Sequence, residues 1–215
     1  MFLFDGDAGA ALTIVLAHGA GASMDSPFMA FFAEGLANRG YRVARFEFPY
    51  MASRRAGGNH NRRPPDPPHV LMETWRAVIA ELGAELGPER LVIGGKSLGG
   101  RIASMVADDA GVRGLVCLGY PFHPPEKQAE AEDKRIAHLK TLRTPALIVN
   151  GTRDAFGMPE EVRGYGLSPA IRVHWLEDGD HNFAPRRKSG LTRQQNVDEA
   201  LQAIAHFLRT RCGAG

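Results

Sequence analysis

Six short stretches of the chain are rich in branched aliphatic residues and have the length of β-strands. They cover residues 12–17, 41–48, 91–93, 115–118, 146–149 and 171–176. Four of them are apolar almost throughout, as expected of parallel strands that helices cover on both faces. In the last stretch, Ile171, Val173 and Trp175 alternate with polar residues, which favours a position nearer the edge of a sheet.

Between these stretches, apolar residues recur at the spacing of amphipathic helices. The clearest stripe runs from Leu71 to Leu86 and stops at Gly87. The other predicted helices are one from about residue 25 to Gly40, one that follows Ser97, and one around residues 197–208. Strand and helix therefore alternate, which predicts an α/β fold with a mostly parallel sheet and helices on both faces.

Two segments interrupt this alternation. Residues 49–69 contain five of the 14 prolines and four arginines, which predicts a long loop at the rim of a site or in solvent. Residues 121–144 are polar and have room for one helix at most, so we expect no cap domain.

Size and composition narrow the class of protein. A chain of 215 residues fits one domain, residues 1–215, with a substantial apolar core. Its 26 basic and 24 acidic side chains argue against a nucleic-acid binder. Two cysteines, Cys117 and Cys212, suit a reducing compartment. With neither an export signal nor a membrane-spanning stretch in view, we expect a soluble, cytoplasmic protein that does not associate with membranes.

The most informative motif is Gly95-Lys96-Ser97-Leu98-Gly99, which lies between a strand and a helix. A serine on such a tight turn projects its hydroxyl from the sheet, and the flanking glycines relieve collisions there, so the motif predicts a nucleophile elbow. A phosphate-binding P-loop is excluded because Arg90 stands where its first glycine is required. An ordinary helix-capping serine is the remaining alternative.

A nucleophilic serine needs a base and an acid that orients it. Asp154 follows the strand at 146–149, and His181 follows the strand at 171–176. Since parallel strands end at one edge of a sheet, Ser97, Asp154 and His181 are predicted to meet there as a catalytic triad. Alternatively, Asp154 is a turn residue or His181 a solvated loop residue, and Glu126 is the other candidate acid.

A loop of small residues, His18-Gly19-Ala20-Gly21, ends the first core strand. The backbone N–H groups of Ala20 or Gly21, together with that of Leu98, are predicted to form an oxyanion hole. We expect His18 to brace this loop rather than act as a base.

Together these motifs resemble the α/β-hydrolase superfamily over nearly the whole chain. They are most similar to a compact branch without a lid, which includes bacterial dienelactone-hydrolase-like proteins and the hydrolase-like domains of a testis-expressed protein and a chromatin-complex subunit. The resemblance implies the α/β-hydrolase fold without a cap domain, and the triad of Ser97, Asp154 and His181. Dienelactone hydrolases have cysteine at the nucleophile position, where this chain has serine, and the resemblance carries no particular substrate.

The sequence thus predicts a carboxylesterase-like serine hydrolase that cleaves an ester or related acyl bond of a small molecule and needs no cofactor. Its activity should fall on acidification through roughly pH 6 to 7, where histidine titrates. The histidines lack metal-ligand spacing, so no metal is expected. The alternatives are a non-catalytic interaction module on the same scaffold and a peptidase.

Overall fold

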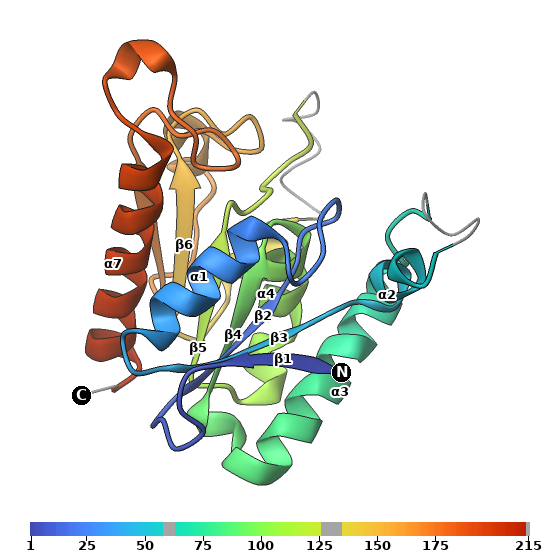
Figure 1. Ribbon diagram of the computed structural model, residues 1–215. Coiled ribbons are helices and arrows are strands. Elements are labelled where there is room, and N and C mark those ends of the chain that lie inside the picture. The colour runs from blue at the N-terminus through green and yellow to red at the C-terminus, as the bar shows by residue number, and fades with distance from the viewer. Residues whose placement is uncertain (58–62, 126–134, 214–215) are drawn as a thin grey trace.

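The computed structural model describes residues 1–57, 63–125 and 135–213. These residues contain a seven-stranded sheet with the order β1-β3-β2-β4-β5-β6-β7, seen in Figure 1. The strands are β1 (Phe2–Asp5), β2 (Thr13–Ala17), β3 (Arg42–Phe46), β4 (Leu91–Lys96), β5 (Gly114–Leu118), β6 (Ala146–Gly151) and β7 (Ile171–Leu176). β1 pairs antiparallel with β3, and all other neighbours are parallel. The predicted mostly parallel α/β sheet is therefore confirmed.

Helices cover both faces of this sheet, as predicted (Figure 1). The α-helices are α1 (Pro27–Ala37), α2 (Pro49–Arg55), α3 (Pro68–Leu86), α4 (Leu98–Ala110), α6 (Pro159–Val162) and α7 (Arg193–Arg211), and short 3₁₀ helices span Pro88–Arg90, Ala137–Lys140 and Arg187–Ser189. One face packs against α3 and α4, the other against α1 and α7. This arrangement buries both sides of the central strands.

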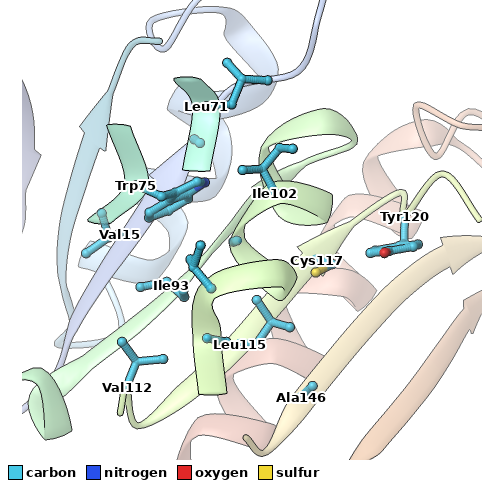
Figure 2. Packing of buried hydrophobic residues seen from close by; sticks show 14 of the residues in the cluster. Val15, Leu71, Trp75, Ile93, Ile102, Val112, Leu115, Cys117, Tyr120 and Ala146 are labelled. Atoms are coloured by element: carbon cyan, nitrogen blue, oxygen red, sulfur yellow. The ribbon is translucent and has the colours of Figure 1, made fainter. Parts of the chain in front are cut away.

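Figure 2 shows the core between the sheet and helices α3 and α4. Trp75 of α3 is fully buried, and its ring meets that of Phe46 edge to face at 4.7 Å between centroids. The Trp75 indole also donates a hydrogen bond to the Gly99 carbonyl, at 3.3 Å. Because Gly99 belongs to the predicted nucleophile elbow, this core directly supports the turn that carries Ser97.

The prediction of a long loop over residues 49–69 was wrong at both ends. Residues Pro49–Arg55 form helix α2, and α3 begins at Pro68, before the apolar stripe at Leu71. Two of the five prolines, Pro49 and Pro68, stand at the first positions of the two helices, where the missing N–H has no intrahelical partner in any case. Residues 58–62 lie outside the described part of the chain.

Two other strands differ from the sequence-based expectation. Strand β1 was not predicted, and it extends the sheet beyond β3. β4 continues past residue 93 to Lys96, so Gly94 and Gly95 both belong to the strand. The ideal Cβ of an alanine at Gly94 would lie 1.8 Å from the Val116 carbonyl oxygen, so a side chain cannot fit there. β7 lies at the end of the sheet, which confirms its predicted edge position.

The polar segment 121–144 contains only the short 3₁₀ helix Ala137–Lys140 among its described residues. Residues 126–134, and with them the alternative acid Glu126, lie outside the described part of the chain. A search of the described helices finds none with the length and apolarity needed to cross a membrane.

Candidate active site

The predicted site residues lie at one edge of the sheet because their strands run parallel. Ser97 follows β4, Asp154 follows β6 by three residues, and His181 lies five residues beyond β7. The loop that begins at His18 follows β2 directly. Four segments that are far apart in the sequence thus meet at the carboxyl ends of their strands, the usual ligand site of such sheets.

Ser97 has the backbone strain expected of a nucleophile elbow. Its φ and ψ are 49° and −112°, a conformation that side chains rarely adopt. The turn passes so close to β2 that an ideal Cβ at Gly95 would lie 2.0 Å, and one at Gly99 2.5 Å, from the Ala17 carbonyl oxygen. Glycine is therefore required on both sides of Ser97, which gives the sequence motif a steric explanation.

A continuous chain of hydrogen bonds joins the three predicted triad side chains. His181 Nε2 lies 2.9 Å from Ser97 Oγ, and His181 Nδ1 lies 2.8 Å from Asp154 Oδ2. A carboxylate only accepts, so Nδ1 carries the imidazole proton, and Nε2 is left to accept the serine proton. This order of serine, imidazole and carboxylate is the arrangement of a Ser-His-Asp catalytic triad.

The protein holds the Asp154 carboxylate in place from several sides. Asp154 is fully buried and receives a hydrogen bond from the Phe156 backbone N–H at 2.9 Å, and a longer one from Asn150 at 3.4 Å. The Asn150 side-chain oxygen accepts a hydrogen bond from the Tyr120 N–H at 2.7 Å, which ties the ends of β5 and β6 together.

The His181 imidazole also has an aromatic neighbour. The centroid of the Phe156 ring lies 4.4 Å from that of the His181 ring. The imidazole is therefore fixed both by its hydrogen bonds and by an aromatic neighbour.

Ser97 and His181 open into a cavity of about 390 Å³. Its other lining residues are Gly19, Ala20, Gly21, Ala22, Ser26, Phe28, Met29, Lys96, Phe156 and Asn182. Two of the predicted oxyanion residues, Ala20 and Gly21, are thus brought to the same cavity as Ser97. Leu98 begins α4, so its N–H belongs to the first helical turn, where backbone donors have no partner within the helix.

His18 braces the small-residue loop, as predicted. Its Nε2 accepts a hydrogen bond from the Phe48 N–H at 3.1 Å, so Nδ1 must carry the proton that it donates to the Gly19 carbonyl at 2.7 Å. Burial lowers the pKa of His18 because the charged imidazolium would lose its hydration. A neutral His18 with a fixed tautomer therefore links β3 to this loop.

Sequence reasoning missed the role of Lys96, although it stands inside the elbow motif. Only 8% of Lys96 is exposed, and its ammonium donates a hydrogen bond of 2.6 Å to the His181 carbonyl oxygen. The Nζ atom also lies 5.5 Å from the centroid of the Phe28 ring. Burial lowers the pKa of Lys96 to about 8. A charged residue beside a motif serine, in a strand that is otherwise apolar, was the signal that could have identified it.

Four aromatic side chains from the segments that follow β3, β5 and β7 belong to the core and not to the lining of the cavity. Tyr50, Tyr120, Phe122 and Phe183 are each 0% exposed. Arg186, in the segment after His181, has a structural role, because it pairs with Asp178 and its backbone N–H donates to the same carboxylate at 2.6 Å. Asp180 accepts the N–H groups of the turn that follows His181.

Among the described residues, no cluster of three or more His, Cys, Asp and Glu side chains could hold a metal ion.

Comparisons with known proteins show the family and the fold of the chain. The family model described as an alpha/beta hydrolase domain matches residues 10–209, so the chain belongs to that family. Figure 1 therefore shows an α/β-hydrolase fold without a cap.

Two solved structures are similar over almost their full length. A dienelactone hydrolase from Anabaena variabilis has a TM-score of 0.72 and 18% identity, covering 98% of this chain and 91% of that one. An α/β serine hydrolase without a lid from Xanthomonas campestris has a TM-score of 0.69 and 19% identity, covering 97% and 87%. At these identities, the likeness concerns the fold.

A curated relative is similar over a shorter stretch. The carboxymethylenebutenolidase of Pseudomonas putida is 35% identical over 103 residues, which are 45% of this chain and 39% of that protein. The chain thus matches about two fifths of the length of this relative.

Proposed function

We propose that the protein is a serine hydrolase that cleaves an ester or related acyl bond of a small molecule through Ser97, His181 and Asp154. The observation that carries the proposal is the hydrogen-bond chain from Ser97 Oγ through His181 to a fully buried Asp154, with contacts of 2.9 and 2.8 Å, at the edge of a cavity. Membership of the α/β hydrolase family supports the same class of reaction.

In the proposed reaction, Ser97 Oγ attacks the acyl carbonyl carbon while His181 Nε2 takes the hydroxyl proton. Asp154 stabilises the imidazolium that forms. His181 then gives the proton to the leaving alkoxide, and the C–O bond breaks to leave an acyl group on Ser97. Water, activated by His181, attacks this ester; the bond between the acyl carbon and Ser97 Oγ breaks, the carboxylic acid is released, and Ser97 regains its proton from His181.

The backbone N–H groups of Ala20 or Gly21, and of Leu98, are the proposed donors to the carbonyl oxygen as it becomes negative. Support comes from the position of Ala20 and Gly21 in the lining of the cavity, and of Leu98 at the start of α4. The helix start also favours negative charge.

The proposed substrates are esters with a small acyl group. Much of the cavity wall consists of glycine and alanine from the loop after β2, with Phe28, Met29 and Phe156 beside them. A cavity of about 390 Å³ is near the small end of ligand sites. The similarity to a carboxymethylenebutenolidase adds cyclic esters to the substrates worth testing.

The test is steady-state hydrolysis of nitrophenyl acetate, butyrate and octanoate, and of a simple lactone, by wild type and Ser97→Ala. We expect turnover of the short esters by wild type, and a loss of at least about 10³-fold in Ser97→Ala. If folded wild type hydrolyses none of these esters faster than Ser97→Ala does, the result would favour the alternative, a non-catalytic interaction module. Cleavage of peptides in preference to esters would favour a peptidase.

A cytoplasmic location is also part of the proposal. It is supported by Cys117 and Cys212, which are free thiols buried in the core.

A further inference from the structure

The loop of residues 18–21, which lines one side of the cavity, is joined to helix α2 by hydrogen bonds. These are separate from the hydrogen bonds that link Ser97, His181 and Asp154. Tyr50 donates its hydroxyl proton to the Gly19 carbonyl oxygen at 3.2 Å, and Arg54 donates to the Ala20 carbonyl oxygen at 3.2 Å. His18 donates to the Gly19 oxygen as well, at 2.7 Å. Two successive carbonyls of this loop are therefore held by side chains.

The direction of these carbonyls determines the direction of two backbone donors. No described peptide bond is cis. In a planar trans peptide, the carbonyl and the N–H of the following residue point in opposite directions. The Ala20 N–H therefore points away from Tyr50, and the Gly21 N–H points away from Arg54. Ala20 and Gly21 both line the cavity that contains Ser97 and His181.

Helix α2 is itself firmly anchored. Tyr50 is fully buried, and its backbone N–H donates to Asp66 at 2.8 Å. Asp66 also accepts a hydrogen bond from Arg63 at 2.9 Å. Arg54 donates to the Arg63 carbonyl oxygen at 2.7 Å, and its guanidinium lies 5.1 Å from the centroid of the Tyr50 ring. The two side chains that hold the loop thus have little freedom to move.

From this arrangement, we propose that Tyr50 and Arg54 are positioning residues, which aim the N–H groups of Ala20 and Gly21 at the substrate oxygen. The proposal rests on the proposed hydrolase function and assigns that site two residues that touch neither substrate nor nucleophile. Helix α2 then serves the site from behind this loop.

The variants Tyr50→Phe, Arg54→Met and their combination test this role, with Arg55→Met as the matched control. Arg55 is the neighbouring residue on α2, but its guanidinium pairs with Glu47 at 2.7 Å and Asp25 at 2.9 Å rather than with the loop. Tyr50→Phe keeps the buried ring and removes one hydroxyl. Because Arg54 is only partly buried, its variant tests the proposal even where Tyr50→Phe does not fold.

Hydrolysis of a short nitrophenyl ester is the first measurement. Removing an oxyanion donor costs on the order of 10²-fold or more, and misaiming one costs a part of that. We expect kcat to fall about 10-fold in Arg54→Met, several-fold in Tyr50→Phe and further in the double variant, while KM changes less than about twofold. Arg55→Met should keep the wild-type kcat.

The affinity for a trifluoromethyl ketone distinguishes a change in the direction of the N–H donors from a general loss of structure at the site. Ser97 Oγ adds to the carbonyl carbon of this inhibitor while its proton passes to His181, and the carbonyl oxygen becomes negative where that of an ester would. Its affinity should fall by the same factor as kcat/KM, with the acid limb of the pH profile unchanged.

Three results would overturn the proposal. A folded double variant with kcat and inhibitor affinity within twofold of wild type contradicts the inference alone. So does a loss of kcat with full inhibitor affinity. A wild type that hydrolyses no ester overturns the proposed function, and this inference with it.

Discussion

The two loops on either side of Ser97 are fixed by different kinds of interaction. The loop around His181 is held by charged groups, with the Lys96 ammonium on the His181 carbonyl and an ion pair between Asp178 and Arg186. The loop after β2 is held by His18 and by Tyr50 of α2, which are both buried; burial lowers the pKa of His18 and raises the pKa of Tyr50 to about 12. Arg54 contributes a charge there, but from the partly exposed side of the loop.

This difference teaches where the site is sensitive. Neutral hydrogen bonds in a packed core change little with pH, whereas a buried ammonium loses hydration and is destabilised when charged. The loop around His181 should therefore respond both to pH and to the removal of a charge. The loop after β2 should respond mainly to the removal of single hydrogen bonds.

The largest effect should come from Asp154→Asn. An amide in place of the carboxylate would favour the imidazole tautomer that carries its proton on Nε2. His181 could then no longer accept the Ser97 proton. We expect kcat to fall by about 10³- to 10⁴-fold with little change in KM. Asp108→Asn is the control, since Asp108 binds Thr144 at 2.8 Å. A fall of less than tenfold in Asp154→Asn would speak against an orienting carboxylate.

A smaller loss should follow from Lys96→Met. Methionine keeps the apolar stem that packs near Gly19 but removes the donor to the His181 carbonyl, so the imidazole should lose alignment with Ser97. We expect kcat to fall about 10- to 100-fold, as for other misplaced catalytic groups. Lys188→Met removes an exposed cation and should leave the rate unchanged. Equal rates for both variants would show that Lys96 does not hold the histidine.

The pH dependence of stability should be the gentlest signal. The pKa of Lys96 is about 8 in the folded protein, against an ordinary value of 10.5. Between these values the unfolded chain binds more protons, so the unfolding free energy of wild type should rise with pH relative to Lys96→Met. This gain in unfolding free energy is fully present above pH 10.5 and is lost as the pH falls to 8 and below. It amounts to about 3 kcal/mol at most. Urea unfolding of both proteins at several pH values measures it, and parallel curves would contradict a buried ammonium.

Much of the fold could be predicted because apolar runs mark buried parallel strands. The alternation with amphipathic helices then places the ends of β2, β4, β6 and β7 at one edge, and with them Ser97, Asp154 and His181. Their proximity followed from topology and chain order, while their catalytic roles stay a prediction until activity is measured.

The supporting residues could not be predicted in the same way. Tyr50 and Arg54 contact loop residues 31 and 34 positions earlier in the sequence, and the prolines around α2 indicated a loop. The partner of Lys96 lies 85 positions away, and no local pattern specifies that contact. Such contacts depend on tertiary packing, which periodicity does not encode.

The central claim is that Ser97 is a nucleophile activated by His181 and Asp154. Intact-protein mass spectrometry after treatment with a fluorophosphonate tests it most directly, with peptide mapping to locate the adduct. The account predicts one phosphonyl group per wild-type chain, on Ser97, with much slower labelling of Asp154→Asn and none of Ser97→Ala. A folded wild type that stays unlabelled, or a Ser97→Ala variant that labels as fast as wild type, would contradict it.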